Sequence, residues 1–304
     1  MRELDLITAM LSYQRPEGSP AQRRFIRRFL LPLPGARQDT AGNVWLQIGS
    51  SPSTLFSAHT DTVHAESGRQ RVQISASGII SLAPEFARNK FGDCLGADNA
   101  AGCYVLMALI RAKVPGLYVF HAAEECGGWG SKYFASTVNK NEFARAVAFD
   151  RRGTSDVITQ MFCGVTASDE FALALADHLP GRYAPCPRGS FTDTANYRDV
   201  VSECTNVSVG YYNEHGPNEK LDSEHLFALA EAAAHVPWNS LPTVRPCEPD
   251  RYEFEPESFA SDVAQDFDRC EICGEFFSYE FLSAEIVCED CRRFFTDLDE
   301  SCAY

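Results

Sequence analysis

The sequence lacks any run of about 18 consecutive apolar residues, the length that a membrane-spanning helix needs. It also lacks the features of a signal peptide, because the opening Met1-Arg2-Glu3-Leu4-Asp5 is charged and no basic segment precedes an apolar one. We therefore expect a cytoplasmic protein without membrane association. The 304 residues are 45% hydrophobic and 12% aromatic, which is enough to bury a full hydrophobic core.

Basic residues are scarce at the C-terminal end. Residues 248–304 hold 17 acidic residues against four arginines, a net charge of −13, whereas the whole chain carries −15. Residues 1–247 are therefore almost neutral. An acidic segment of this strength repels phosphate backbones, so we expect no nucleic-acid partner.

Apolar residues recur either every three to four positions or in short continuous runs, and the two patterns alternate along the chain. The first is typical of helices and the second of buried strands. The runs predict strands at 44–48, 54–58, 117–120, 147–149 and 207–209. The helical spacing predicts helices at 4–13, 21–31, 99–112, 169–179 and 222–236. This alternation predicts an α/β fold, a three-layer sandwich with a central, mostly parallel sheet flanked by helices.

A change in composition near residue 237 predicts a domain boundary. Prolines interspersed with acidic residues cannot continue a helix and indicate a linker, namely Pro237, Pro242, Pro246, Pro249 and Pro256. We expect a large domain at 1–237, an acidic, proline-rich linker at 238–265 and a small module at 266–304.

Side chains that can bind metal ions follow predicted strands or stand at the start of a predicted helix: His59, Asp61, Asp98, Glu124, Glu125, Asp150 and His215. For example, His59 comes directly after the strand at 54–58, and Asp98 precedes the helix at 99–112. Ligands of an open α/β sheet collect at the carboxyl ends of its strands. We therefore expect these side chains to converge on one crevice.

The segments around these residues resemble those of the co-catalytic di-zinc exopeptidases, which include aminopeptidases, carboxypeptidases, dipeptidases and small-molecule deacylases. The resemblance covers most of residues 1–235. Its segments occur in the family's order, which argues against coincidence: Asp39-Thr40-Ala41-Gly42-Asn43, Ser57-Ala58-His59-Thr60-Asp61, Gly96-Ala97-Asp98-Asn99, Glu124-Glu125-Cys126-Gly127-Gly128-Trp129-Gly130-Ser131, Asp150 and Glu214-His215.

The resemblance implies which residues bind metal. His59 and Asp150 are expected to hold one zinc ion, and Glu125 and His215 are expected to hold the other. Asp98 is expected to bridge the two. Imidazole and carboxylate groups suit zinc, although cobalt or manganese can also occupy such sites.

Two further residues are expected to serve catalysis. Glu124, adjacent to a ligand but not itself one, would take a proton from the attacking water and pass it to the leaving amine, as general base and then general acid. Asp61, two residues after His59, would orient that imidazole through its second nitrogen.

Taken singly, each residue has a simpler interpretation. A histidine after a strand is more often a hydrogen-bonded loop residue, and adjacent glutamates are more often a solvated edge, so it is the ordered set that favours a functional site. The segment at 190–194 resembles the family's Thr-Asp segment and could line the substrate pocket, although such clusters are more often turns or helix caps. The remaining histidines match no motif position, and we expect structural roles for them: His64, His121, His178, His225 and His235.

The spacing of the ligands leaves no room for a lid domain. Asp150 and His215 are 65 residues apart, and this interval already holds a predicted helix and strand. Between His59 and Asp98, the segment at 72–81 predicts only a hairpin. We expect a lidless domain like the compact aminopeptidases.

Two Cys-x-x-Cys pairs, 14 residues apart, lie near the C-terminus: Cys270, Cys273, Cys288 and Cys291. Four thiolates at this spacing predict one tetrahedral structural zinc ion, in a module that resembles a zinc ribbon or a treble-clef-like knuckle. Two disulfides or a redox site are alternatives that a cytosolic location disfavours. The acidic surroundings favour a protein partner or substrate gating over DNA binding.

The sequence thus predicts a di-zinc hydrolase of amide bonds, an aminopeptidase-like exopeptidase that acts on a small peptide or an acylated amine. Two alternatives stay open. An N-acyl amino-acid deacylase would use the same metal core, because specificity depends on the pocket walls. A catalytically degenerate domain would make the protein an adaptor that acts through the zinc module, although retention of the site residues argues against this.

Overall fold

The computed structural model describes residues 2–87, 92–247, 267–269 and 276–278. The chain divides into two units, Met1–Asp250 and Arg251–Tyr304. In the second unit, β17 (Phe267–Arg269) pairs antiparallel with β18 (Phe276–Ser278). The predicted domain boundaries stay predictions. The predicted zinc module does too, because its four proposed ligands lie outside the described residues: Cys270, Cys273, Cys288 and Cys291.

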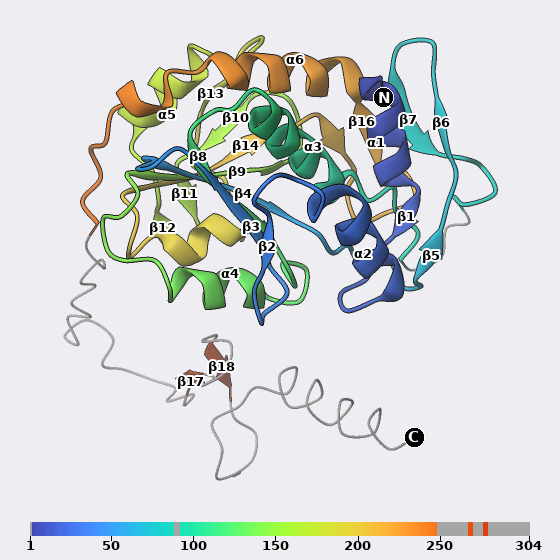
Figure 1. Cartoon of the computed structure of the whole chain (residues 1–304), viewed down its shortest axis with the longest axis horizontal. Helices are drawn as coiled ribbons and strands as arrows, with labels where there is room; N and C mark the ends of the chain where they lie inside the picture. Colours follow the sequence, from blue (N-terminus) through green and yellow to red (C-terminus); the bar gives the residue numbers. More distant parts are fainter. Residues whose placement is uncertain (1, 88–91, 248–266, 270–275, 279–304) are drawn as a thin grey trace, which may run out of the picture. The chain divides into compact units, whose positions relative to one another are not determined.

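An eight-stranded sheet forms the centre of the first unit, in the order β13–β10–β14–β9–β4–β8–β3–β2 (Figure 1). Its strands are β2 (Arg37–Gln38), β3 (Val44–Ile48), β4 (Thr54–His59), β8 (Gly116–His121), β9 (Arg145–Arg151), β10 (Asp156–Ile158), β13 (Ala184–Cys186) and β14 (Glu203–Ser208). The central strands β14, β9, β4 and β8 run parallel, whereas β3 pairs antiparallel with β8 and β10 pairs antiparallel with β14. The predicted α/β fold is confirmed, with a parallel centre and antiparallel pairings toward both edges.

Smaller antiparallel pairings complete the strands of this unit. β6 (Val72–Ile74) and β7 (Ile79–Leu82) form the predicted hairpin. β7 also pairs with β16 (Lys220–Asp222), which pairs with β15 (Tyr211–Tyr212). β1 (Tyr13–Gln14) pairs with β5 (Gly68–Arg69), and β11 (Gln160–Met161) pairs with β12 (Gly164–Val165).

Several helices begin where a short polar side chain caps them. Ser19, Ser168 and Asp222 each accept a backbone N–H from the helix that follows, and so start α2 (Pro20–Phe25), α5 (Asp169–Ala176) and α6 (Ser223–His235). Further helices are α1 (Glu3–Leu11), α3 (Ala97–Arg111) and α4 (Trp129–Ala135), a π-helical segment at Ile26–Leu30 and 3-10 turns at Asp193–Tyr197 and Trp238–Ser240. No helix in the described residues combines the length and apolar character needed to cross a membrane.

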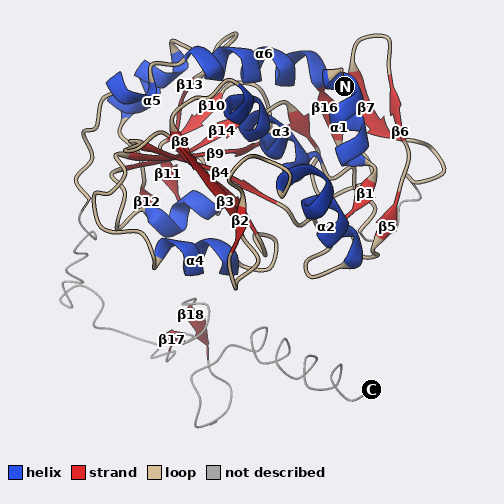
Figure 2. Ribbon diagram, in the orientation of Figure 1, coloured by secondary structure: helices blue, strands red, loops and turns tan. Residues whose placement is uncertain are grey.

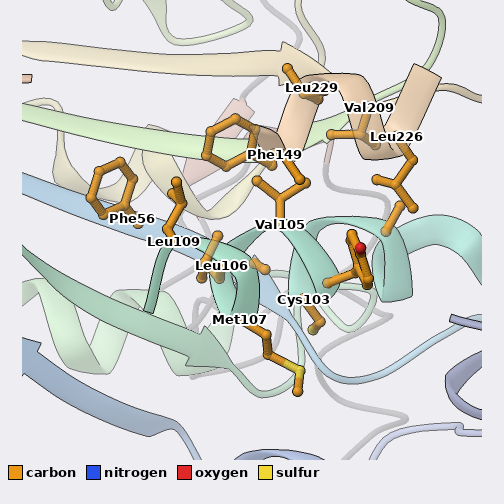
Figure 3. Close-up of a cluster of buried hydrophobic side chains, with 14 of the residues drawn as sticks. Phe56, Cys103, Val105, Leu106, Met107, Leu109, Phe149, Val209, Leu226 and Leu229 are labelled. Atoms are coloured by element: carbon orange, nitrogen blue, oxygen red, sulfur yellow. The ribbon is translucent and has the colours of Figure 1, made fainter. Parts of the chain in front are cut away.

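Side chains of the central strands alternate between two hydrophobic cores, one on each face of the sheet. Helices α3 and α6 lie on one side of the strands and α4 lies on the other (Figure 2). Phe56 and Phe149 share the first core with Val105 of α3 and Leu226 of α6 (Figure 3). The second core contains Leu55, Val119, Phe134, Ala146 and Tyr197. Packing on both faces therefore holds the central strands in place.

Candidate metal centre

The parallel strands bring three of the predicted ligands to one edge of the sheet. His59 is the last residue of β4, which pairs in parallel with both β8 and β9. Asp150 lies near the end of β9, and Glu125 lies in the turn after β8. Because parallel strands end at the same edge, these three side chains approach one another there.

The carboxylate of Asp98, at the start of α3, lies between the two predicted histidine ligands. Its Oδ1 is 3.0 Å from His59 Nε2, and its Oδ2 is 3.2 Å from His215 Nε2. Asp150 Oδ1 is 3.4 Å from His59 Nε2, and Glu125 Oε1 is 3.1 Å from His215 Nε2. Asp98 thus lies between two pairs of side chains. Its Oδ1 faces the pair His59 and Asp150, and its Oδ2 faces the pair His215 and Glu125.

These side chains suit divalent cations. Ligand atoms of His59, Asp98 and Glu125 all lie within 4.8 Å of one another. Imidazole nitrogens and carboxylate oxygens are donors that zinc, cobalt and manganese accept. Several carboxylates close together at a largely buried site are costly without a cation to balance them.

The pKa shifts of the proposed ligands also favour a bound cation. Burial opposes the ionisation of Asp98, yet the imidazoles of His215 and His59 hold its pKa well below the usual range. Hydrogen bonds to Asp98 and Glu125 raise the pKa of His215 to about 11. Burial and the neighbouring Asp98 raise the pKa of Asp150 to about 7. Negative charge is therefore concentrated here, and a bound cation would relieve it.

Glu124 lies beside the ligands at a longer distance. Its Oε2 is 4.0 Å from His59 Nε2, and its side chain is only 10% exposed. Burial raises the pKa of Glu124 well above its usual value; His59 opposes this effect, and Asp150 and Asp193 add to it. A raised pKa means that the carboxyl group takes up a proton more readily, which suits a group that accepts a proton and then returns it.

Asp61 connects His59 to the loop that carries both glutamates. Its Oδ1 is 3.4 Å from His59 Nδ1, the nitrogen that faces away from Asp98. The same oxygen accepts the backbone N–H of Glu124 at 3.2 Å, and Oδ2 accepts that of Glu125 at 3.0 Å. The sequence predicted only the contact with His59, whereas the structure adds the two backbone bonds.

Glu219 is a buried carboxylate that the sequence analysis missed. It accepts the backbone N–H of Gly96 at 2.9 Å and that of Asp98 at 3.1 Å. Burial and the charge of Asp98 raise the pKa of Glu219 to about 7. Its position four residues after His215 is the only signal in the sequence, because a carboxylate that binds backbone amides leaves no pattern of its own.

The segment at 190–194 borders the centre. Thr192 Oγ1 donates a hydrogen bond to Asp150 Oδ2 at 2.9 Å. Asp193 is fully buried, and burial raises its pKa well above the usual value. Phe191 lies against Gly128, where an added Cβ would come within 2.4 Å of the ring atom Cζ. The segment thus contacts both a predicted ligand and the loop that follows Glu125.

Two of the histidines that match no motif position are buried among hydrogen-bond partners. His64 Nδ1 lies 2.6 Å from Thr62 Oγ1. His121 bonds Asn43 through Nδ1 at 3.2 Å and the Tyr197 hydroxyl through Nε2 at 3.1 Å. These three contacts fit the structural roles expected for the two histidines.

Neither a protein-family profile nor a curated protein sequence matches this chain. Its fold does match solved structures. They show that the chain has an α/β fold that aminopeptidases also have.

The individual structures are peptidases. The aminopeptidase PepT from Bacillus cereus has a TM-score of 0.62 at 13% identity, over 77% of this chain and 96% of that one. A tripeptidase from Staphylococcus aureus has a TM-score of 0.59 at 12% identity, over 77% and 96% of the two chains. The Pyrococcus horikoshii TET1 peptidase, which can assemble into a tetrahedron or a large octahedral shell, has a TM-score of 0.54 at 16% identity, over 77% and 98%.

Proposed function

We propose that this chain is a metal-dependent hydrolase of amide bonds that acts as an aminopeptidase-like exopeptidase on small peptides. The observation that carries the proposal is the Asp98 carboxylate, whose two oxygens lie 3.0 and 3.2 Å from the Nε2 atoms of His59 and His215. The peptidases among the similar structures support an amide as the bond that is cleaved.

Five side chains would hold two metal ions. His59 and Asp150 would bind one ion, Glu125 and His215 would bind the other, and Asp98 would bridge them. Zinc is our first choice, with cobalt or manganese as alternatives. When bound, such a pair polarises a substrate carbonyl and lowers the pKa of a water molecule.

Glu124 would move the proton. A water molecule that attacks the substrate carbonyl must lose a proton, and the leaving amine must gain one, so one carboxylate can do both in sequence. Asp61 would orient the His59 imidazole, and it would also fix the backbone of Glu124 through the bond to its N–H. Asp61 would thus fix the position of Glu124, the proposed general base, relative to His59, a proposed metal ligand.

An aromatic pair would form part of the substrate pocket. Phe162, between β11 and β12, is 70% exposed, and its ring centroid is 5.9 Å from that of Phe191. Phe191 precedes Thr192, whose hydroxyl contacts Asp150. Because Thr192 links this aromatic pair to a proposed ligand, we expect a preference for substrates with an apolar side chain next to the scissile bond.

A combined measurement of bound metal and hydrolysis tests the proposal. The full-length chain should bind about three zinc ions, two at this centre and one at the four C-terminal cysteines. It should hydrolyse aminoacyl or dipeptide amides, and a chelator should stop the reaction. Hydrolysis restricted to N-acetyl amides would instead indicate a deacylase on the same centre. One zinc ion per chain without chelator-sensitive hydrolysis would favour an adaptor that contacts a protein partner through the zinc module.

A further inference from the structure

A carboxylate outside the predicted site holds the loop that carries Glu124. Glu17 lies between β1 and α2, 106 residues before Ala123 in the sequence. Its Oε2 accepts the backbone N–H of Ala123 at 2.9 Å. The same oxygen accepts the side-chain amide of Gln22 at 2.6 Å. The N-terminal part of the chain therefore reaches the turn after β8.

Glu17 completes a row of three consecutive backbone N–H groups that donate to carboxylates. Ala123 donates to Glu17, and the next two residues, Glu124 and Glu125, donate to Asp61. Ala123 has a φ of 56°, in the left-handed region that a residue with a Cβ adopts only at a cost. Each of the three N–H groups donates to an acceptor oxygen that another part of the fold holds in place, so the three hydrogen bonds together can hold the turn in that conformation.

Gln22 links Glu17 to the segment that carries His59. Its Nε2 also donates to Thr60 Oγ1 at 3.0 Å, and Thr60 directly follows His59. Gln22 is 2% exposed, so water does not compete for these bonds. The Glu17–Gln22 pair thus ties the loop of the proposed general base to the loop of a proposed metal ligand.

We propose that Glu17 is a positioning residue, which sets the direction of the Glu124 carboxylate by holding the Ala123 amide. This role rests on the proposed hydrolase function. Glu17 acts through geometry, because the Ala123 N–H and the Gln22 amide both donate to a single oxygen, Oε2 of Glu17. A glutamine at this position would also supply one such oxygen. A displacement of about 1 Å at a catalytic group can cost about 10²-fold in rate, so the effect should fall on kcat.

Two variants separate geometry from charge. Glu17→Gln keeps an oxygen acceptor and loses the charge, whereas Glu17→Ala loses both. With saturating metal, Glu17→Ala should lower kcat about 10- to 100-fold while KM and bound metal change by less than about threefold. Glu17→Gln should keep kcat within about threefold of wild type. Equal losses in the two variants would show that the charge matters, and an unchanged kcat in Glu17→Ala would show that the bond does not; either result overturns the proposal.

Glu203→Ala is the matched control. Glu203 is fully buried and, like Glu17, accepts backbone N–H groups, from Ser168, Val244 and Arg245. It stands at the first residue of β14, the end of the parallel strands opposite to the ligands. Glu203→Ala should lower the melting temperature without lowering kcat at temperatures where the variant is folded.

The control and the wild type make the outcomes distinguishable. A kcat loss in Glu203→Ala equal to that in Glu17→Ala would mean that loosening any buried loop is sufficient, which overturns the specific role of Glu17. An active wild type with an equally active Glu17→Ala contradicts the positioning role alone. A wild type that binds metal yet hydrolyses no amide contradicts the proposed function, and the role of Glu17 falls with it.

Discussion

The backbone N–H of Asp98 donates to the carboxylate of Glu219, which is fully buried 3.1 Å away. Glu219 also accepts the N–H of Gly96. These donors lie at the N-terminus of α3, where the helix dipole favours a negative charge. Glu219 therefore fixes the segment that places Asp98 between His59 and His215.

Glu219→Ala should weaken metal binding about 10- to 100-fold, because Asp98 would lose the support that aims its carboxylate. Competition with a chelator measures this affinity. Glu219→Gln, which keeps one oxygen acceptor, should lose less. An affinity equal to that of the wild type in Glu219→Ala would show that Asp98 needs no such support.

Glu124→Gln should retain both metal ions and lower kcat about 10²- to 10⁴-fold, because the amide cannot accept a proton. Metal analysis and steady-state kinetics on the same sample test both parts. Glu142→Gln, at an exposed glutamate, serves as the control. Activity near the wild-type level in Glu124→Gln would remove Glu124 as the general base.

Asp61→Asn should leave the chain folded and lower its metal affinity about tenfold or more, because the amide replaces one of the two oxygens that contact His59 and the glutamate loop. Circular dichroism reports the fold, and chelator competition reports the affinity. Loss of the folded state with full metal affinity in the residual folded fraction would contradict this expectation.

Phe162→Ala should reduce the preference for leucyl over alanyl substrates about tenfold, since apolar contacts of this size are worth about 1–3 kcal/mol. The measurement is the ratio of kcat/KM values for the two amides. Leu173→Ala removes a side chain that is 54% exposed on α5 and should leave the ratio unchanged. An unchanged ratio in Phe162→Ala would exclude the aromatic pair from the pocket.

Acid should destabilise the chain through His64. Burial, assisted by the charge of Arg15, lowers the pKa of His64 to about 4. An unfolded histidine has a pKa of about 6.5, so between these values the unfolded chain binds a proton that the folded chain excludes. The free energy of unfolding therefore falls as the pH is lowered from about 6.5 to about 4, by about 3 kcal/mol from this residue.

His64→Gln isolates this contribution, because the variant cannot bind the proton in either state. The stability advantage of the wild type over His64→Gln, measured by denaturant titration, should be about 3 kcal/mol smaller at pH 4 than at pH 7. His178→Gln controls for replacing an exposed histidine. An advantage that does not change with pH would contradict the prediction.

The sequence predicted the strands and helices that carry apolar patterns. The expected strand at 44–48 coincides with β3, and the expected helix at 222–236 matches α6. Helix α4 was missed because it starts directly after two glycines and lies on the loop of the glutamates. Strands β10 and β13 were missed because three residues are too few to show a period.

The candidate site was partly predictable for a related reason. Histidines and carboxylates that follow parallel strands must lie at one edge, so His59 and Asp150 could be placed together from sequence order alone. Glu17 and Glu219 could not, because they bind backbone amides that every residue carries. Their partners depend on how distant segments pack, which neither composition nor spacing records.

The register of the central strands has a consequence for folding. His59 of β4 stands opposite His121 of β8. Successive side chains of a strand point to opposite faces, so a slip of one residue would turn His59 away from Asp98. Metal uptake at this proposed centre, counted apart from the zinc ion expected at the four C-terminal cysteines, would then distinguish correctly aligned chains from compact, misaligned ones.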